Sequence, residues 1–184
     1  IEDPERCAQY AGDWSWLKPR VPPLVVRPNS TEQAAQLIEL LYRQGVMMTL
    51  RGAGTGKAGG CIPTQDSVVI TTEHLVGPPV ARSEDLVVQS PAGTLAADLD
   101  HCAAEHGLFY PPDPNSLAIS SIGGNVATNA GGPRAVKYGL TGHYLLGLTM
   151  VGAQGEVIKT GAATIKSVGG SNLSGLMLGS EGTF

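Results

Sequence analysis

The order of apolar and polar residues near the start of the chain predicts a strand, a helix and a second strand. Residues 24–27 (LVVR) form a short apolar run that is typical of a strand. Ser30 begins a capping-box pattern, apolar residues then recur at steps of three and four, and Gly45 supplies a helix stop. Residues 46–50 suit a buried strand. Together these elements predict a β-α-β unit that leads into a glycine-rich loop at residues 51–60.

Further strands and a second helix are predicted in the middle of the chain. Residues 67–71 (SVVIT) and 86–90 (LVVQS) have the β-branched composition of strands. Thr94 is placed to cap a helix that ends at Gly107. Residues 110–132 contain little that favours a long element, yet apolar residues recur in them, so we expect a folded loop.

The last part of the chain predicts a hairpin and one short helix. Residues 145–153 and 156–160 flank Gln154-Gly155, a pattern typical of a β-hairpin. Residues 172–178 are expected to form a short helix. No internal repeat or run of charges interrupts this succession.

Composition narrows the class of protein. The 184 residues include 25 Gly and 13 Pro, which disfavours helical bundles and coiled coils, and the Gly has no collagen-like period. Apolar residues make up 42% and charged residues 15%, so the chain is too apolar and too weakly charged for intrinsic disorder. We therefore expect a loop-rich globular fold with a buried core.

Charge, cysteine count and hydropathy bear on location and partners. The net charge is −4 and the basic residues are dispersed, which disfavours nucleic acid as a partner. Three widely spaced Cys fit neither a disulfide framework nor a zinc site and favour a reducing, cytoplasmic location. No apolar run is long enough to cross a membrane, and the first residues lack the layout of a signal peptide. The run before Phe184 has no stop signal, so we expect a fragment of a longer protein.

The loop RGAGTGKAGG at residues 51–60 is the first candidate site. It contains a GxGxxG match after a predicted strand, but GCIP follows where a dinucleotide-binding fold would open a helix, and a Walker loop also fails to match. Successive glycines still allow neighbouring N–H groups to bind one anion, with Thr55 as a further donor and Arg51 or Lys57 as positive charge. A pyrophosphate would fit such a loop. The alternative is a connector without a ligand.

A second candidate site lies in residues 116–132. Neutral polar side chains alternate there with apolar anchors, which predicts buried hydrogen-bonding groups that need partners. The pairs Gly123-Gly124 and Gly131-Gly132 allow a flat or bulky group to approach the backbone closely. Such a wall suits a heterocycle with several hydrogen-bonding edges, and packing with internal hydrogen bonds is the alternative. Its polar residues are Ser116, Ser120, Ser121, Asn125, Thr128 and Asn129.

Four blocks of sequence, taken together, resemble one enzyme family. They are RGAGTGKAGG at residues 51–60, PPDPNS at 111–116, SIGGNVATNAGGPRAVKYG at 121–139 and GLMLGSEGTF at 175–184. They resemble the FAD-linked oxidases of the vanillyl-alcohol oxidase/p-cresol methylhydroxylase type. Within that family they look most like the branch of glycolate oxidase flavoprotein subunits and D-lactate dehydrogenases. The resemblance covers residues 20–184.

The resemblance implies an α+β fold in which two α/β subdomains of the PCMH-type FAD-binding fold hold an extended FAD between them. We expect an N-terminal arm at residues 1–19, a first subdomain with the pyrophosphate loop at 20–76, and a second at 77–184 that is truncated at its C-terminus. The implied activity is that of an FAD-dependent oxidoreductase on CH–OH donors, in which hydride passes from a 2-hydroxy acid such as glycolate or D-lactate to flavin N5. The alternatives are a non-catalytic FAD-binding module and a non-redox flavoenzyme such as alkyl-dihydroxyacetonephosphate synthase.

The family's cofactor contacts carry over residue by residue. The pyrophosphate would be held by Arg51, Gly52, Ala53, Gly54, Thr55, Gly56 and Gly60. The ribityl and isoalloxazine region would be lined by Pro112, Asp113, Pro114, Ser116, Ser121, Ile122, Gly124, Asn125, Thr128, Asn129 and Gly131. Glu181 and Gly182 belong to a block that closes near the adenine. Some relatives attach the flavin covalently through a His where this chain has Thr55, so FAD is expected to be non-covalent here.

The resemblance places the chemistry of substrate oxidation outside these residues. The family adds a substrate domain over the flavin, so the groups that bind a small 2-hydroxy acid, any metal ligands and the base are expected beyond Phe184. No catalytic residue is therefore assigned in this chain. Partner subunits for electron transfer are compatible with the family, whereas a nucleic acid partner and a direct membrane span are not expected.

Four further side chains are interpreted structurally. Cys102 and His106 share a face of a predicted helix, but two ligands make a poor metal site, so no metal is expected. Met47 and Met48 lie in a predicted strand and are expected to pack in the core.

Overall fold

A three-stranded parallel sheet organises the first half of the molecule. Its strands are β1 (Val25–Val26), β2 (Met48–Arg51) and β3 (Val68–Thr71), in the order β1-β3-β2. The central strand β3 is buried along its whole length, because it has a neighbour on each edge and a continuous run of β-branched residues. Since the strands are parallel, β2 and β3 end at the same edge of the sheet, where Arg51 pairs with Thr71.

The helix α2 (Thr31–Arg43) connects β1 to β2, as the sequence predicts. The Ser30 hydroxyl accepts a hydrogen bond from Gln33 N at 3.2 Å, and Gly45 follows the helix with a φ of 65°. The capping box is shifted by one residue, because Gln33 Oε1 accepts from Asn29 N rather than from Ser30 N. The predicted β-α-β unit is confirmed, with β3 inserted between its two strands.

Two short helical turns precede β1 and pack on the sheet. They are α1 (Pro4–Cys7) and the 3-10 turn η1 (Ala8–Tyr10). Cys7 and Tyr10 are buried and form a core cluster with one valine from each of β1 and β3. Helices this short leave no periodic pattern in the sequence, which is why neither was predicted.

The second half begins with an antiparallel pair and a helix. The pair consists of β4 (Val80–Arg82) and β5 (Val87–Gln89), and the helix is α3 (Ala96–Glu105). The expected cap of this helix is wrong. Its N-cap is Leu95, which makes no side-chain cap bond, whereas the Thr94 hydroxyl donates to Gly77 O at 3.2 Å.

Residues 110–132 are not a loop throughout, which corrects the sequence-based expectation. They contain the helix α4 (Ile122–Ala127), whose N-cap Ser121 accepts a hydrogen bond from Gly124 N at 3.3 Å. The Gly pair at its start lowers helix propensity, so this short segment gave no helical signal. The helix α5 (Ala135–Tyr138) and the 3-10 turn η2 (Thr141–Tyr144) follow.

The predicted hairpin and last helix are confirmed. They are β6 (Gly147–Val151), β7 (Val157–Gly161) and α6 (Leu173–Met177). The hairpin turn reaches α2 in the first half. Gly155 there adopts a φ of 87° and lies so close that a Cβ on it would be 2.6 Å from Ala35 O, and Gln154 Nε2 donates to the Tyr42 hydroxyl at 3.4 Å.

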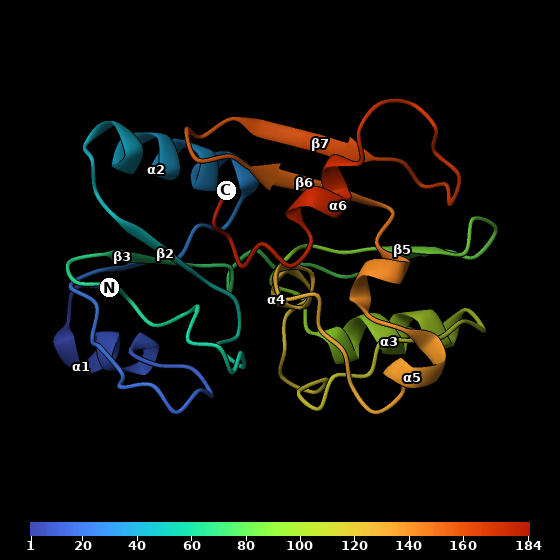
Figure 1. Ribbon diagram of the computed structural model, residues 1–184, viewed down its shortest axis with the longest axis horizontal. Helices are drawn as coiled ribbons and strands as arrows, with labels where there is room; N and C mark the ends of the chain where they lie inside the picture. Colours follow the sequence, from blue (N-terminus) through green and yellow to red (C-terminus); the bar gives the residue numbers. More distant parts are fainter.

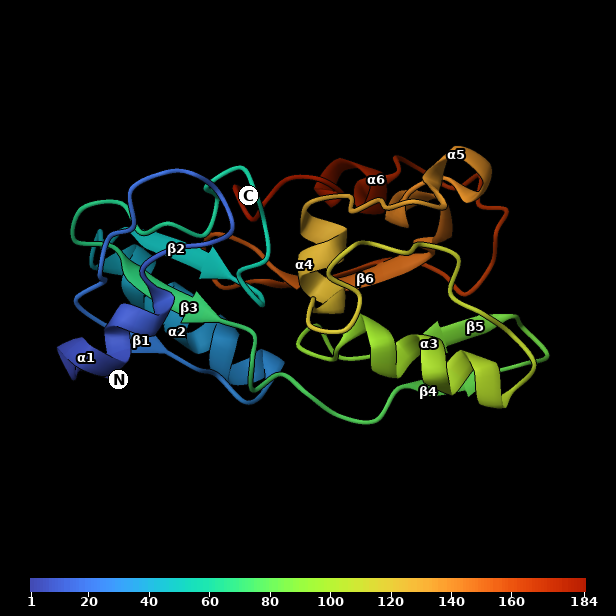
Figure 2. The same cartoon turned by 90° about the horizontal axis from the view of Figure 1, so that it is seen from below.

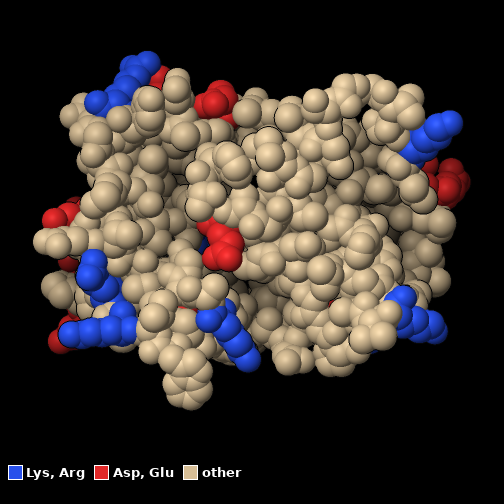
Figure 3. Space-filling view, in the orientation of Figure 1, with Lys and Arg blue, Asp and Glu red and all other residues tan.

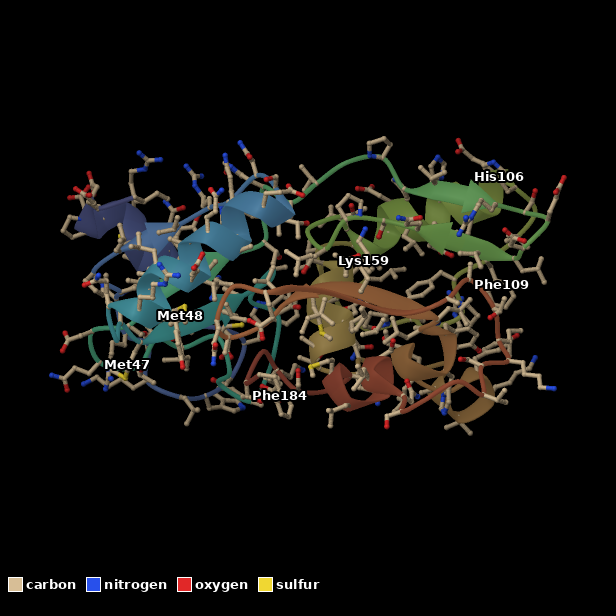
Figure 4. The ribbon with its side chains drawn as sticks, turned by 90° about the horizontal axis from the view of Figure 1, so that it is seen from above. Met47, Met48, His106, Phe109, Lys159 and Phe184 are labelled. Carbon is tan, nitrogen blue, oxygen red and sulfur yellow. The ribbon has the colours of Figure 1, made fainter.

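A computed structural model describes residues 1–184 of the protein. The molecule has two halves that lie side by side (Figures 1 and 2). The strands β1–β3 with α1 and α2 form one half, and α3–α6 with β4 and β5 form the other. The chain crosses between the halves after β3, and its last residues return toward the first half, so Phe184 lies near their boundary (Figure 4). None of the helices combines the length and the apolar surface that a membrane span requires. The predicted boundaries at residues 19 and 76 stay a prediction.

The surface corrects one further expectation. Met47 is 53% exposed, so it does not pack in the core as expected, whereas Met48 is half-buried. Figure 4 shows Met47 at the outer end of the first half and His106 at the far end of the second half. On the face in Figure 3, Lys and Arg are dispersed over separate places and do not form one basic patch.

Candidate functional site

The glycine-rich loop leaves the carboxyl end of β2 and provides a row of free backbone donors. Gly54 has a φ of 71° and Gly59 a φ of 87°, a region that glycine adopts without strain. No backbone N–H group from residues 53–60 donates a hydrogen bond to another backbone group, whereas the Gly52 N–H faces the Cys61 thiol. The Thr55 hydroxyl is also without a partner in the chain. The loop can therefore offer several donors to one anion.

The guanidinium of Arg51 lies beside this loop. It lies across Gly54, donates to Gly12 O at 2.7 Å, and sits 5.7 Å from the centre of the Tyr10 ring. The Lys57 side chain, the other expected source of charge, is exposed. Arg51 is therefore the cation that the fold holds in place beside the loop.

The two loops that the sequence singles out come into contact. A Cβ on Gly52 would lie 2.7 Å from Ser121 Oγ and 3.4 Å from Gly124 Cα. The Ser121 hydroxyl also caps α4, so the start of this helix lies directly against the start of the glycine-rich loop. Only glycine at position 52 allows this approach without displacing a neighbour.

A cavity of about 430 Å³ opens at this contact, between the two halves. Four of its residues were predicted from the sequence, namely Arg51, Gly52, Ala53 and Ser121. The others were missed: Gln9, Tyr10, Thr72, Glu73, Val76, Gly93 and Leu95. Thr72 and Glu73 directly follow β3, and the carboxyl end of a parallel strand is the one signal that would have indicated them.

Polar atoms without partners are buried around the cavity, the glycine-rich loop and α4. They are Thr72 Oγ1, Ser120 Oγ, Asn125 Nδ2 and Asp13 Oδ2. Asn125 is only 3% exposed, so its side-chain amide is shielded from water. Its Nδ2 has no hydrogen-bond acceptor within the protein. Such orphaned groups indicate a site built for a polar ligand.

The block at residues 112–116 is held by packing against a neighbouring turn. Pro112 and Pro114 are buried, and Asp113 forms an ion pair of 2.9 Å with Arg134. The carbonyl of Asp113 lies against Gly132 so closely that a side chain there would clash. Ser116 is half-buried, Ile122 is half-buried in the first turn of α4, and Gly131 is exposed beside Leu140.

The residues that follow α4 are joined to the end of the chain. Thr128 Oγ1 donates to Gly124 O at 2.9 Å, and Asn129 Oδ1 accepts from Gly142 N at 3.0 Å, so both side chains have partners in the chain. Glu181 N donates to Ala127 O at 2.8 Å, and its carboxylate lies against Gly60. Gly182, with a φ of 76°, lies against Leu50 of β2. The fourth sequence block therefore reaches the glycine-rich loop.

Cys61 directly follows the glycine-rich loop in the sequence. Burial raises the pKa of its thiol, the nearby positive charge of Arg51 opposes that rise, and the carboxylates of Asp13 and Glu181 add to it. The thiol therefore stays protonated to higher pH than an exposed cysteine.

A comparison with protein families shows to which family the chain belongs. A family model described as an FAD binding domain matches residues 22–161. The chain belongs to the FAD binding domain family. FAD is accordingly the cofactor of this domain, as the sequence blocks indicated.

Curated relatives and a solved structure agree with this FAD-binding domain. The chain is 37% identical over 163 residues to glycolate oxidase subunit GlcD of Bacillus subtilis (89% of this chain, 35% of that protein). It is 38% identical over 160 residues to D-lactate dehydrogenase of Archaeoglobus fulgidus (87% and 36%). It is also 33% identical over 181 residues to D-2-hydroxyglutarate dehydrogenase of Xanthomonas citri (98% and 38%). The chain thus spans about a third of the length of these relatives.

The fold is shared with a solved structure of alkyldihydroxyacetonephosphate synthase. The TM-score is 0.84 at 22% identity, over 100% of this chain and 35% of that one. This likeness confirms the expected FAD-binding fold and leaves the reaction open, because the sequence identity is low.

The residues present fit FAD. A pyrophosphate needs hydrogen-bond donors, and the free N–H groups of residues 53–60 supply them. An isoalloxazine ring presents carbonyl and nitrogen acceptors, which suit the orphaned amide Nδ2 of Asn125. The cavity is lined by Gly52 and Ala53 at the start of the loop and by Ser121, the N-cap of the helix that carries Asn125.

Proposed function

We propose that this FAD-binding domain belongs to an oxidoreductase that oxidises a small 2-hydroxy acid. The proposal is supported by the relatives that match most of the chain, because those enzymes are named for glycolate, D-lactate and D-2-hydroxyglutarate. The synthase shares the fold at lower identity, so it gives no equal support for a non-redox reaction. When bound, FAD supplies a hydride acceptor.

The residues of this chain would bind and orient the cofactor. In the proposal, the backbone of residues 52–60 binds the pyrophosphate, the Thr55 hydroxyl adds a donor, and Arg51 keeps one positive charge beside it. Ser121, Gly124 and Asn125 would line the flavin side, where Gly52 lets the two halves approach each other. The subdomains would comprise residues 20–76 and 77–184, with residues 1–19 as an N-terminal arm.

Binding of the 2-hydroxy acid itself is assigned to a part of the protein outside this domain. The domain corresponds to about a third of the length of its relatives. We therefore propose that the rest of the protein contributes the substrate-binding groups, the base and any metal ligands. Partner subunits for electron transfer would contact that larger protein.

Anaerobic reduction of the bound flavin tests the proposal. The purified full-length protein should show flavin absorbance, and this absorbance should bleach on addition of glycolate, D-lactate or D-2-hydroxyglutarate. A Gly54→Val variant should lose the flavin, because a β-branched residue is strongly strained at a positive φ. Bound flavin that none of these acids reduces would contradict the oxidoreductase proposal and leave FAD binding intact.

A further inference from the structure

We propose that residues 10–14, here called the N-terminal strap, fix the glycine-rich loop in the shape that binds FAD, with Arg51 as the positioning residue that ties strap and loop together. The strap lies outside residues 22–161, which the family model matches. The inference rests on the proposed placement of the FAD pyrophosphate at residues 52–60. It adds a segment to the cofactor site that the sequence blocks did not include.

The strap contacts the loop at two points along its length. Trp14 N donates to Gly56 O at 2.9 Å, and Arg51 Nη1 donates to Gly12 O at 2.7 Å. The Tyr10 ring lies under the same guanidinium, 5.7 Å from its carbon. Both hydrogen bonds join the strap to the residues that begin and centre the loop.

The strap is itself held in one conformation. The Tyr10 hydroxyl donates to Glu73 Oε1 at 2.7 Å, and its ring is almost completely buried. Asp13 Oδ1 accepts from Ser15 N at 2.9 Å, and Arg20 N donates to Ala11 O at 2.8 Å. The strap therefore presents a fixed donor and a fixed acceptor to a loop that lacks such bonds of its own.

The loop needs an external support because its own sequence provides little rigidity. Glycine has more backbone freedom than any other residue, and the N–H groups of residues 53–60 make no backbone hydrogen bonds within the chain. The N–H and C=O groups of a trans peptide point in opposite directions. Because the Gly56 carbonyl points toward Trp14 in the strap, the N–H of Lys57 points away from it. Anchoring carbonyls on one side in this way leaves N–H groups free on the other side for an anion.

Proline substitution at two neighbouring positions isolates the backbone contact. Trp14→Pro removes the N–H that Gly56 O accepts, whereas Trp14→Ala keeps it. Trp16 is fully exposed, lies outside the strap, and donates no backbone hydrogen bond, so Trp16→Pro is the matched proline control. For the side-chain tie, Arg51→Met removes the bond to Gly12 O and the charge, and Arg51→Lys keeps a cationic donor.

The measurement is the dissociation constant of FAD from the flavin-free full-length protein, followed by flavin fluorescence. We expect Trp14→Pro and Arg51→Met to weaken binding about tenfold, with partial recovery in Arg51→Lys, and Trp14→Ala and Trp16→Pro to stay within about twofold of wild type. In wild type, hydrogen exchange at the Trp14 amide should slow when FAD is added.

Three outcomes decide between this inference and the proposed site. If folded Trp14→Pro binds FAD like wild type, while Gly54→Val does not bind, the strap inference is wrong and the loop site stands, whatever the result for Arg51→Met, because Arg51 also contributes its charge to the site. If Trp14→Pro and Trp16→Pro weaken binding equally, the strap inference is also wrong. If wild type binds FAD and Gly54→Val binds it equally well, the placement of the pyrophosphate fails, and the inference fails with it.

Discussion

Gly52 and Ser121 lie so close together that a Cβ on the glycine would be 2.7 Å from the serine Oγ. One residue follows a strand of the first half and the other caps a helix of the second half. This contact keeps the glycine-rich loop and α4 at a fixed spacing, and the cavity between the halves opens beside it.

Gly52→Ala should destabilise the protein by about 1–3 kcal/mol, because the added methyl group collides with the Ser121 hydroxyl. Ser121→Ala should cost about 1 kcal/mol through the lost helix cap. In the double variant the collision is relieved, so its loss should be smaller than the sum of the two single losses. Urea denaturation measures all three. Gly169→Ala is the control. A Cβ added at position 169 would have no neighbouring atom within 4 Å, so this substitution should be close to neutral.

Asn125→Leu should change cofactor affinity and apoprotein stability in opposite directions. The Asn125 amide is buried with an unpartnered Nδ2, and leaving such a group unpaired costs about 1–3 kcal/mol, so the flavin-free variant should be at least as stable as wild type. The same change removes a donor from the flavin side, so the FAD dissociation constant should rise about tenfold.

The control for this variant is Asn29→Leu, the same substitution at an exposed position. It should alter neither FAD affinity nor stability by a large amount. An Asn125→Leu protein that loses stability but binds FAD normally would show that the amide serves the fold and not the cofactor.

FAD should leave the protein completely on denaturation. Thr55 has a hydroxyl where some relatives link the flavin through an imidazole, and a threonine hydroxyl does not form that link. Acid precipitation followed by absorbance of the supernatant measures the released fraction. Fluorescence that stays with the protein band on a denaturing gel would contradict this prediction.

Alkylation of Cys61 should report on Arg51. Since burial raises the pKa of this thiol, its thiolate fraction at a given pH is below that of an exposed cysteine, and its alkylation should accelerate only at higher pH. Arg51 lowers the same pKa, so Arg51→Met should raise it further and slow alkylation at fixed pH. Lys57→Met removes an exposed charge of the same loop and should leave the rate nearly unchanged. Peptide mass spectrometry separates Cys61 from the other two cysteines.

Strong local signals explain which elements could be predicted. Residues 24–50 combine a strand, a helix with a Ser30 cap and a Gly45 stop, and each signal agrees with the next. The helix α4 was missed because its two glycines disfavour a helix in isolation, and packing against the rest of the protein outweighs that preference. Thr94 was misassigned because its hydroxyl has a distant acceptor, Gly77 O, that local spacing does not reveal.

The candidate site could be predicted where its residues are close in sequence. Residues 51–56 and 121–129 form dense Gly and polar blocks, whereas Tyr10 and Thr72 are single residues brought to the cavity by the fold. No property of Tyr10 in the sequence indicates that it lies under the guanidinium of Arg51. Long-range placement of this kind depends on tertiary packing, which a local pattern does not encode.

The carboxylate of Glu181 lies against Gly60, and the N–H of Trp14 bonds to Gly56, so both ends of the chain meet at one short loop. During synthesis the loop leaves the ribosome early, but the last of these neighbours follows more than a hundred residues later. The complete cofactor site can therefore form only after nearly all of this domain has been made. Bound flavin would then mark molecules that have finished folding, and scarcity of flavin would leave the finished chains less stable.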